Sequence, residues 1–508
     1  MARLGLFLLL CCVLLQLNAF SYLSIFTLHL KYTFAAPRPE FGSIGTVQSS
    51  QTIRFTVSST TPQFAAIDDK NNVVLLTNYT LFGEVLSLMK ELGSNVTTLG
   101  TTITNVTIDA IPKTDGNYAA VFSPIFNSIQ AFLTYIDTDV NRTRTTLYNR
   151  LGDDINVLFG DGFGNMRKAL VMVDAAFRRL QGAITTAAVK NGRAQVDASI
   201  TLDIMIAVSF LKATVSPVEY IVHSTIENIE FADTYLNDLE LLTVQFNSDL
   251  VYYLSEFNST LTDYGEVVVE STDYIKNGWN AVAAKLPNAT TTITALPEYN
   301  QTATALAQFS SSFSELSNMT AKIVEGIVQY VNISNTYLTE YTQALVPRSY
   351  SSINYLFEIL IGGGANSRFC FFKFSPLLLN YYALIVTDVE LCFIIESSRM
   401  FLLSDVAVEV GRIILFDVED LIDNLTFCSK QSSPARCLAA IGPYYVALAE
   451  KTTAKLGFLL KYGAAEGRAS IQRLGSCLTT NKLKNIQQII SATSDIADCH
   501  VNGPEIPI

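Results

Sequence analysis

The middle of the chain carries two long stripes of hydrophobic residues at helical spacing. The first stripe consists of Leu239, Leu242, Phe246, Leu250, Tyr253, Phe257, Leu261, Tyr264 and Val268. The second consists of Leu306, Phe309, Phe313, Leu316, Ile323, Ile327, Tyr330, Tyr337 and Tyr341, with Thr320 and Ser334 as weaker positions. Steps of three or four residues place side chains on one face of a helix. Both stripes predict amphipathic helices that pack in a core or coiled-coil-like seam, although an aromatic stripe can also line a ligand cavity.

Proline placement divides the chain further. Residues 108–350 contain few prolines, with none between Pro124 and Pro217, so long helices are permitted in this central region. We expect Pro347 and the glycine run 362–364 to close it and mark a linker. Residues 37–107 are instead rich in Ser, Thr and Gly. This segment predicts an extended or loosely folded, glycosylated region.

Six cysteines remain in the last third of the chain once Cys11 and Cys12 leave with a signal peptide. They are Cys370, Cys392, Cys428, Cys437, Cys477 and Cys499. Their intervals of 22, 36, 9, 40 and 22 residues are nearly symmetric about the loop 429–436. At about 100° per residue, these intervals keep the cysteines of each arm near one helix face.

The symmetry predicts a nested pairing across two antiparallel helices: 370 with 499, 392 with 477, and 428 with 437. An acidic first arm and a basic second arm favour the same hairpin. Six cysteines allow other connectivities, so three disulfides within a bundle of shorter helices are the alternative. No zinc site is expected, because no C-x-x-C motif or Cys/His cluster occurs.

The N-terminus predicts a secretory signal peptide over residues 1–19. Arg3 supplies the basic start, residues 4–17 the apolar stretch and Ala19 the small residue before the cut. A second apolar stretch continues to residue 36. An uncleaved signal anchor is the alternative, since a span needs about 20 residues. We expect secretion, membrane attachment only if this segment is not cleaved, and no further spanning segment, because later apolar runs are interrupted by polar residues.

Ten Asn-x-Ser/Thr sequons predict an N-glycosylated surface behind that signal. The acceptors are Asn78, Asn95, Asn105, Asn141, Asn258, Asn288, Asn300, Asn318, Asn332 and Asn424. Asn318 and Asn332 each follow a stripe residue by two positions, so we expect both to face solvent. Asn424 lies one turn before Cys428, near the disulfide face, and fits less well.

The sequence lacks the residues and motifs that several functions require. The formal net charge is −12, and no stripe of basic residues interleaved with aromatics occurs, so nucleic-acid binding is not expected. Only His223 and His500 lie beyond the leader region, and no catalytic motif is present. The glycine-rich stretch 160–164 matches no phosphate-binding fingerprint and predicts a helix-breaking turn. We expect no enzyme activity, cofactor or metal site.

The cysteine-containing region, residues 367–500, resembles the TsetseEP-type domain of secreted dipteran proteins. The resemblance rests on Ser367-Arg368-Phe369-Cys370, Phe374-Ser375-Pro376-Leu377, Asp388-Val389-Glu390-Leu391-Cys392 and the four cysteines that follow. It implies a secreted insect protein, of the midgut in the namesake, with no established catalysis. The chain lacks the Glu-Pro repeat of that namesake, so no function of the repeat is carried over.

Together these features predict an all-α fold of long helices in a bundle or coiled-coil-like arrangement, with a C-terminal disulfide-stapled antiparallel hairpin. The function expected first is a secreted, non-enzymatic structural or interaction glycoprotein of an insect extracellular lumen. Its partner would be an extracellular protein, a glycan or a second copy. The alternative is an extracellular carrier of apolar ligands in a helical-bundle cavity, favoured by the aromatic faces and the apolar residues 377–427.

Overall fold

The computed structural model describes residues 40–43, 47, 49–114, 116–189 and 196–504. Over these residues the chain is all-α, as predicted, with one isolated bridge between Val47 and Val196 as its only β pairing. The predicted signal peptide and the apolar stretch that follows it lie outside the described residues. The chain forms two compact units: unit 1 runs to Thr234 and includes Glu358–Ser367, and unit 2 comprises Tyr235–Phe357 and the chain from Arg368 onward.

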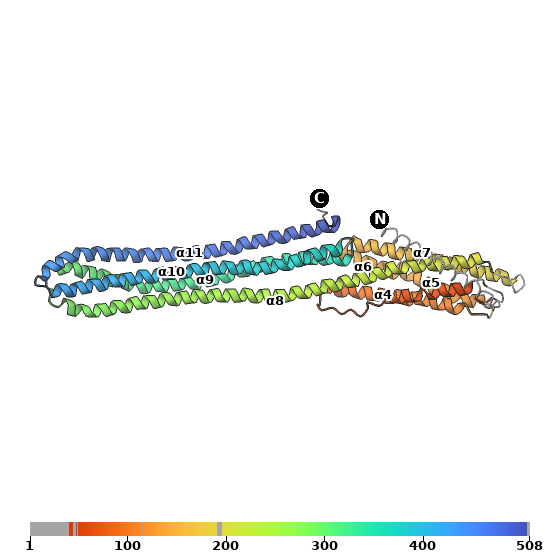
Figure 1. Cartoon of the computed structure of the whole chain (residues 1–508), viewed down its shortest axis with the longest axis horizontal. Helices are drawn as coiled ribbons and strands as arrows, with labels where there is room; N and C mark the ends of the chain where they lie inside the picture. Colours follow the sequence, from red (N-terminus) through yellow and green to blue (C-terminus); the bar gives the residue numbers. More distant parts are fainter. Residues whose placement is uncertain (1–39, 44–46, 48, 115, 190–195, 505–508) are drawn as a thin grey trace, which may run out of the picture. The chain divides into compact units, whose positions relative to one another are not determined.

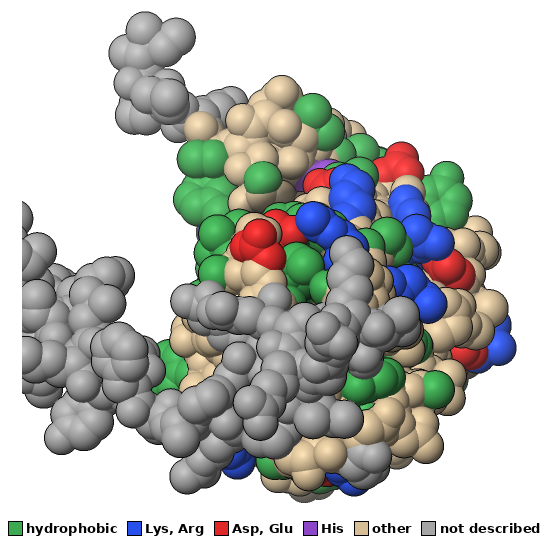
Figure 2. Space-filling view, turned by 90° about the vertical axis from the view of Figure 1, so that its right-hand side faces the viewer, with side chains coloured by type: hydrophobic (Ala, Val, Ile, Leu, Met, Phe, Trp, Pro, Cys, Tyr) green, Lys and Arg blue, Asp and Glu red, His purple; other side chains and the backbone are tan. Residues whose placement is uncertain are grey.

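Unit 1 is built from helices that precede the two stripes. They are α2 (Ser50–Ser58), α3 (Thr61–Ala66), α4 (Thr80–Ala110), α5 (Tyr118–Tyr135), the π-helical turn η1 (Ile136–Val140), α6 (Asn141–Leu151), α7 (Asp153–Val189) and the first part of α8 (Ala198–Thr290). Arg150, Arg167 and Arg179 form ion pairs with acids of other helices in this unit. On the face drawn in Figure 2, basic and acidic side chains accordingly lie among neutral and hydrophobic ones.

The expectation that residues 37–107 are extended or loosely folded is wrong. Helix α4 covers much of this segment and buries Phe82, Met89 and Val96 along one face. Its threonines do not interrupt the helix, because hydroxyls such as those of Thr98 and Thr102 donate to the carbonyl four residues earlier. Composition therefore misled, whereas the apolar spacing within the same residues indicates the helix.

The turn expected at residues 160–164 is also wrong, because this stretch lies within α7. A Cβ atom on Gly162 would lie 2.7 Å from Cδ1 of Ile221, so this glycine lets α7 approach α8 closely. The glycine-rich stretch therefore serves helix packing in unit 1.

Unit 2 is a helical bundle in which the remainder of α8 packs with α9 (Tyr299–Gly362), α10 (Ser367–Ser429) and α11 (Pro434–Asn502). Figure 1 shows these helices side by side along their length. α9 ends at the predicted glycine run, where Gly363 takes a φ of 73°. Pro347, expected to help end the region, lies inside α9, because the loss of one backbone hydrogen bond does not stop a helix whose ends are packed.

Both predicted stripes form the core of this bundle. Phe257, Leu261 and Tyr264 of α8 are buried, as are Phe309 and Tyr330 of α9. The rings of Phe257 and Tyr330 meet at 5.4 Å between centroids, and those of Trp279 and Phe313 at 5.0 Å. Residue numbers rise along α8 as they fall along α9, so the two helices are antiparallel. Leu242 is the exception in the first stripe, since it is exposed.

α9 and α11 run in the same direction and are joined by pairs of polar side chains. The hydroxyls of Ser312 and Thr453, Tyr330 and Ser470, and Ser352 and Thr493 lie 2.7 to 3.0 Å apart. The sequence separation within these pairs is 140 or 141 residues throughout. A constant offset over this length means that one register is kept along both helices.

α10 and α11 form the predicted antiparallel hairpin. Disulfides join Cys370 to Cys499, Cys392 to Cys477 and Cys428 to Cys437, with Cα–Cα distances of 5.9, 5.9 and 5.4 Å. This is the nested pairing that the spacing predicts. α11 begins at Pro434, where proline suits the first helical turn, and it continues through Pro443.

Three described helical stretches are long and apolar enough to cross a membrane: Tyr118–Leu151, Ala198–Thr290 and Ser367–Ser429. The expectation that no later segment has this property is therefore wrong, because a spanning window tolerates isolated charges that interrupt a continuous run. Only 33%, 39% and 29% of their most apolar windows are buried inside the protein. These helices therefore leave much apolar surface exposed.

Removing the outer disulfide is expected to cost more stability than removing the innermost one. With Cys392–Cys477 intact, the outer bond closes two segments of 22 residues each, for which the chain-entropy model gives about 4 kcal/mol. The nine-residue loop of Cys428–Cys437 gives about 2.6 kcal/mol. Replacing both cysteines of each bond by Ser and measuring unfolding in urea tests this order. Equal losses, or a larger loss at the inner bond, would contradict it.

Candidate functional site

The described part of the chain contains no group of three or more His, Cys, Asp and Glu residues that could hold a metal ion. All six cysteines of the described residues are joined in disulfides. The structure therefore brings the predicted cysteine residues together as covalent links between helices.

Most predicted glycan acceptors lie at the surface. The exposed ones are Asn78, Asn105, Asn141, Asn288, Asn300, Asn318 and Asn332. Asn95, Asn258 and Asn424 are half-buried. The Asn424 amide donates to the Tyr445 hydroxyl at 2.7 Å, so a glycan there would break a contact between α10 and α11. The sequence predicted that Asn424 is a less suitable glycan acceptor, because it lies near the disulfide face of its helix. The contact with Tyr445 gives the structural reason.

Unit 2 contains a cavity of about 470 Å³ between all of its helices, here called the bundle cavity. Its floor is apolar and buried: Leu261 and Tyr264 of α8 and Met400 and Leu403 of α10 are each less than a tenth exposed. Cavities of 300–1,000 Å³ with apolar walls are typical of small-molecule sites. The bundle cavity therefore has the size and the lining of a site for one apolar ligand.

Small residues open the bundle cavity between α9 and α11. Gly326 of α9 and Gly463, Ala464 and Gly467 of α11 line it. A Cβ atom on any of these three glycines would meet no atom within 4 Å, so close helix packing does not explain them. Gly475 differs, because its Cβ would lie 2.7 Å from Cζ of Tyr337. Each glycine inside a helix lowers the stability of that helix by about 1 kcal/mol relative to Ala. At Gly326, Gly463 and Gly467 the missing side chain leaves open space.

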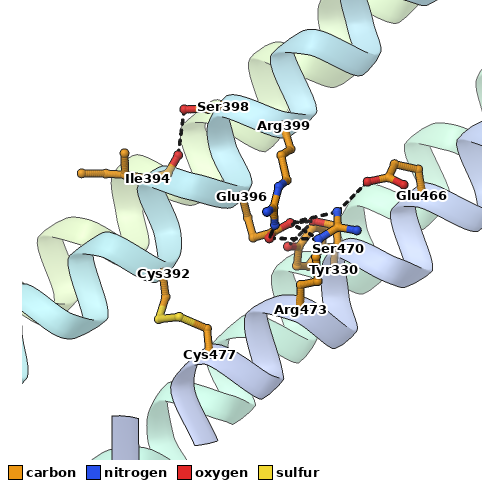
Figure 3. A network of polar contacts seen from close by, with 10 residues as sticks. All are labelled: Tyr330, Cys392, Ile394, Glu396, Ser398, Arg399, Glu466, Ser470, Arg473 and Cys477. Atoms are coloured by element: carbon orange, nitrogen blue, oxygen red, sulfur yellow. Dashed lines mark hydrogen bonds and ion pairs between the residues drawn. A yellow bond between two sulfur atoms is a disulfide. The ribbon is translucent and has the colours of Figure 1, made fainter. Parts of the chain in front are cut away.

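A buried polar network, drawn in Figure 3, lies at the end of the bundle cavity marked by Tyr330. Tyr330 also lines the cavity, and its hydroxyl lies 2.7 Å from Oγ of Ser470. Ser470 donates to a carboxylate oxygen of Glu396 at 2.6 Å, and Arg473 donates to the same carboxylate at 3.1 to 3.3 Å. Arg399 also donates to Glu396.

The network carries a charge inside the bundle. The Glu396 side chain is 3% exposed, whereas that of Arg473 is 34% exposed. Arg473 also donates to Glu466 at 2.6 Å, and its pKa is raised, chiefly by the hydrogen bond to Glu396. A buried carboxylate is tolerated only when it is paired and hydrogen-bonded. Glu396 therefore links α9, α10 and α11 at one level of the bundle.

Burial keeps the tyrosines of this region protonated. It raises the pKa of Tyr264 to about 12, and it raises the pKa of Tyr330 and of Tyr341 further. The Tyr341 hydroxyl accepts a hydrogen bond from the amide of Asn485 at 2.9 Å. These phenols act as neutral hydrogen-bonding groups at neutral pH.

A second cleft of about 530 Å³ lies beside the Cys392–Cys477 disulfide. Its charged lining residues are Glu396, Arg399 and Arg473, which already pair with one another. The charges of this cleft are satisfied within the protein. The bundle cavity is therefore the stronger candidate.

Comparison with models of known protein families, with curated protein sequences and with solved structures gives no match. The candidate site therefore depends on geometry alone. Its apolar floor includes stripe residues, but the sequence did not reveal the opening. The glycines of α11 were visible in the sequence, but the sequence does not separate Gly463 and Gly467, which leave open space, from Gly475, which permits a close contact with Tyr337.

Replacing Glu396 by Gln is expected to lower the free energy of unfolding by about 1–3 kcal/mol, since the neutral amide cannot match two charge-assisted contacts. Thermal or urea unfolding measures the loss. Glu409→Gln is the matched control, because Glu409 also pairs with an Arg three residues on but is 63% exposed. The control should change stability by less than about 0.5 kcal/mol. Equal effects would mean that the buried network stabilises nothing.

Proposed function

We propose that the protein is a secreted, non-enzymatic carrier of apolar ligands. The observation that supports this proposal is the bundle cavity, with its buried apolar floor and its glycine-lined opening. A core meant only for packing fills such space, because voids lose dispersion contacts and water ordered against apolar walls is unfavourable. Three disulfides, which form and persist in oxidising compartments, support secretion.

A second candidate is the structural glycoprotein, assembled from copies of this chain. Exposed hydrophobic residues follow α10, among them Leu391, Leu402 and Phe416, with exposed fractions of 53%, 66% and 68%. α11 exposes Tyr444 and Phe458. Residues 367–500 contain a single sequon, at Asn424, so glycans leave most of this hairpin uncovered.

Charge favours a second copy as the occupant of the hairpin surface. The exposed acids of α10 include Asp405 and Glu409, and the exposed bases of α11 include Lys451 and Lys455. In a two-fold arrangement, α10 of each copy would meet α11 of the other, which places opposite charges together around apolar contacts. Both candidates are compatible, because the cavity and the hairpin surface use different residues.

Replacing Gly467 by Leu tests the carrier proposal. The leucine side chain should fill the bundle cavity and abolish binding of the neutral fluorophore Nile red, measured by fluorescence titration. The helix should gain about 0.5–1 kcal/mol at the same time, because leucine is the better helix former. Lost binding with raised stability cannot result from unfolding.

Gly457→Leu is the matched control for this test. Gly457 is also a helical glycine of α11 whose Cβ would meet no atom within 4 Å, but it does not line the cavity. The control should gain similar stability and keep Nile red binding. If both variants bind as the parent does, or if the parent does not bind, the cavity is not a ligand site.

Light scattering of the secreted protein tests the assembly candidate. The parent should have the mass of a dimer, and replacing Leu402 and Phe416 by Glu should halve it, because buried unpaired carboxylates oppose association. The control replaces Leu241 and Val244 of α8 by Glu as well; these two residues are 64% and 70% exposed. It should remain a dimer. A monomeric parent at all concentrations would exclude self-association as the function.

A further inference from the structure

The opening of the bundle cavity carries basic side chains from two helices. Lys322 of α9 and Lys461 and Arg468 of α11 line the cavity, and all three are exposed. The offset of 140 or 141 residues between α9 and α11 places Lys322 nearly level with Gly463. Lys322 and Lys461 therefore lie at the same end of the cavity, and Arg468 lies about 10 Å further along α11.

These cations have no acidic partner among the described residues. No ion pair joins Lys322, Lys461 or Arg468 to an Asp or Glu of the part of the chain that the structure describes, whereas Arg473 and Lys484 of α11 both pair with acids. The described lining of the cavity also includes no acidic side chain. In a chain whose formal net charge is −12, this is a local excess of positive charge.

The floor of the cavity holds a polar group that is also unused. The Tyr264 side chain is 5% exposed and lines the cavity. Its hydroxyl makes no hydrogen bond to another described residue and is not fully enclosed by protein atoms, so it is accessible to a ligand or to water. A polar atom of a ligand, or a water beside it, would complete this position.

The dimensions of the cavity suit one extended chain. The lining runs from Lys322 to Tyr330 along α9, which is about 12 Å by the helical rise. Along α11 it runs from Lys461 to Ile471, which is about 15 Å. The polar network of Glu396 and Ser470 lies at the end marked by Tyr330, so the cations lie mainly toward the opposite end.

We propose that the bundle cavity binds a single-chain amphiphile with an anionic head group, namely a free long-chain carboxylate. The hydrocarbon chain lies on Leu261, Met400 and Leu403, and the carboxylate lies at Lys322 and Lys461, with Arg468 adding positive charge further along the opening. This assignment rests on the carrier proposal and adds the chemical class of the ligand. It follows from the apolar floor, the unpaired cations and the absence of acids from the described lining.

Three ligands with the same chain and different head groups test the assignment. Dodecanoate, dodecanol and dodecyltrimethylammonium are titrated below their micellar concentrations into the delipidated, full-length glycoprotein, and displacement of Nile red reports binding. Dodecanoate should bind about tenfold more tightly than dodecanol, because its charge is paired in a partly desolvated site, and the ammonium should bind most weakly. Raising the ionic strength should reduce the preference for dodecanoate.

Removing charge at the opening separates head-group binding from chain binding. Lys461→Gln with Arg468→Gln should weaken dodecanoate binding about tenfold and leave dodecanol binding within about twofold. Lys451→Gln with Lys455→Gln is the matched control, because it removes two exposed charges from the same helix outside the cavity. The control should bind dodecanoate as the parent does, and the melting temperatures of all variants should agree.

The possible failures are distinguishable. Equal affinity for the three ligands, or equal effects of the two double variants, would overturn the carboxylate assignment and leave the carrier proposal standing. Displacement of Nile red by none of them would overturn the carboxylate assignment, whereas failure of Nile red itself to bind would overturn the carrier proposal and this assignment together. Binding to anionic phospholipid vesicles without binding of monomeric dodecanoate would also overturn the assignment, since the cations would then serve a membrane surface.

Discussion

The covalent register between α10 and α11 is the constraint on which the rest of unit 2 depends. The Cys370–Cys499 and Cys392–Cys477 bonds fix both helices at two levels 22 residues apart on each. Four residues beyond Cys392, the same register brings Glu396 opposite Arg473. The buried network therefore lies where the disulfides place it, at one end of the bundle cavity. Without that register, the buried carboxylate would lose its partners.

The cavity results from glycines of α11 that have no side chain to fill the space between the helices. Gly463 and Gly467 weaken α11 as a helix, and neither is needed for a close contact. The neighbouring disulfides offset such local weakness, because they limit the conformations of the unfolded chain. The bundle can therefore keep open space next to a covalently held hairpin.

Much of unit 2 was predictable because its signals are periodic. Stripe residues such as Phe257 and Tyr330 follow helical spacing, and the cysteine intervals are symmetric about one loop. Unit 1 was less predictable: the threonines of α4 suggested an irregular segment, although their hydroxyls bond back to the helix. Gly162 suggested a turn, yet it serves a contact with Ile221 that only tertiary structure reveals. The cavity was missed for the same reason, since a glycine that leaves open space and one that permits contact look alike in sequence.

The polar pairs between α9 and α11 also limit how the bundle can open. Sliding α9 by one turn would separate Ser312 from Thr453, Tyr330 from Ser470 and Ser352 from Thr493 at once. α11 cannot move away from α10, because disulfides hold that pair, whereas none joins α9 to its neighbours within the described residues. A ligand can therefore enter and leave through the glycine-lined opening between α9 and α11 while the hairpin of α10 and α11 stays closed.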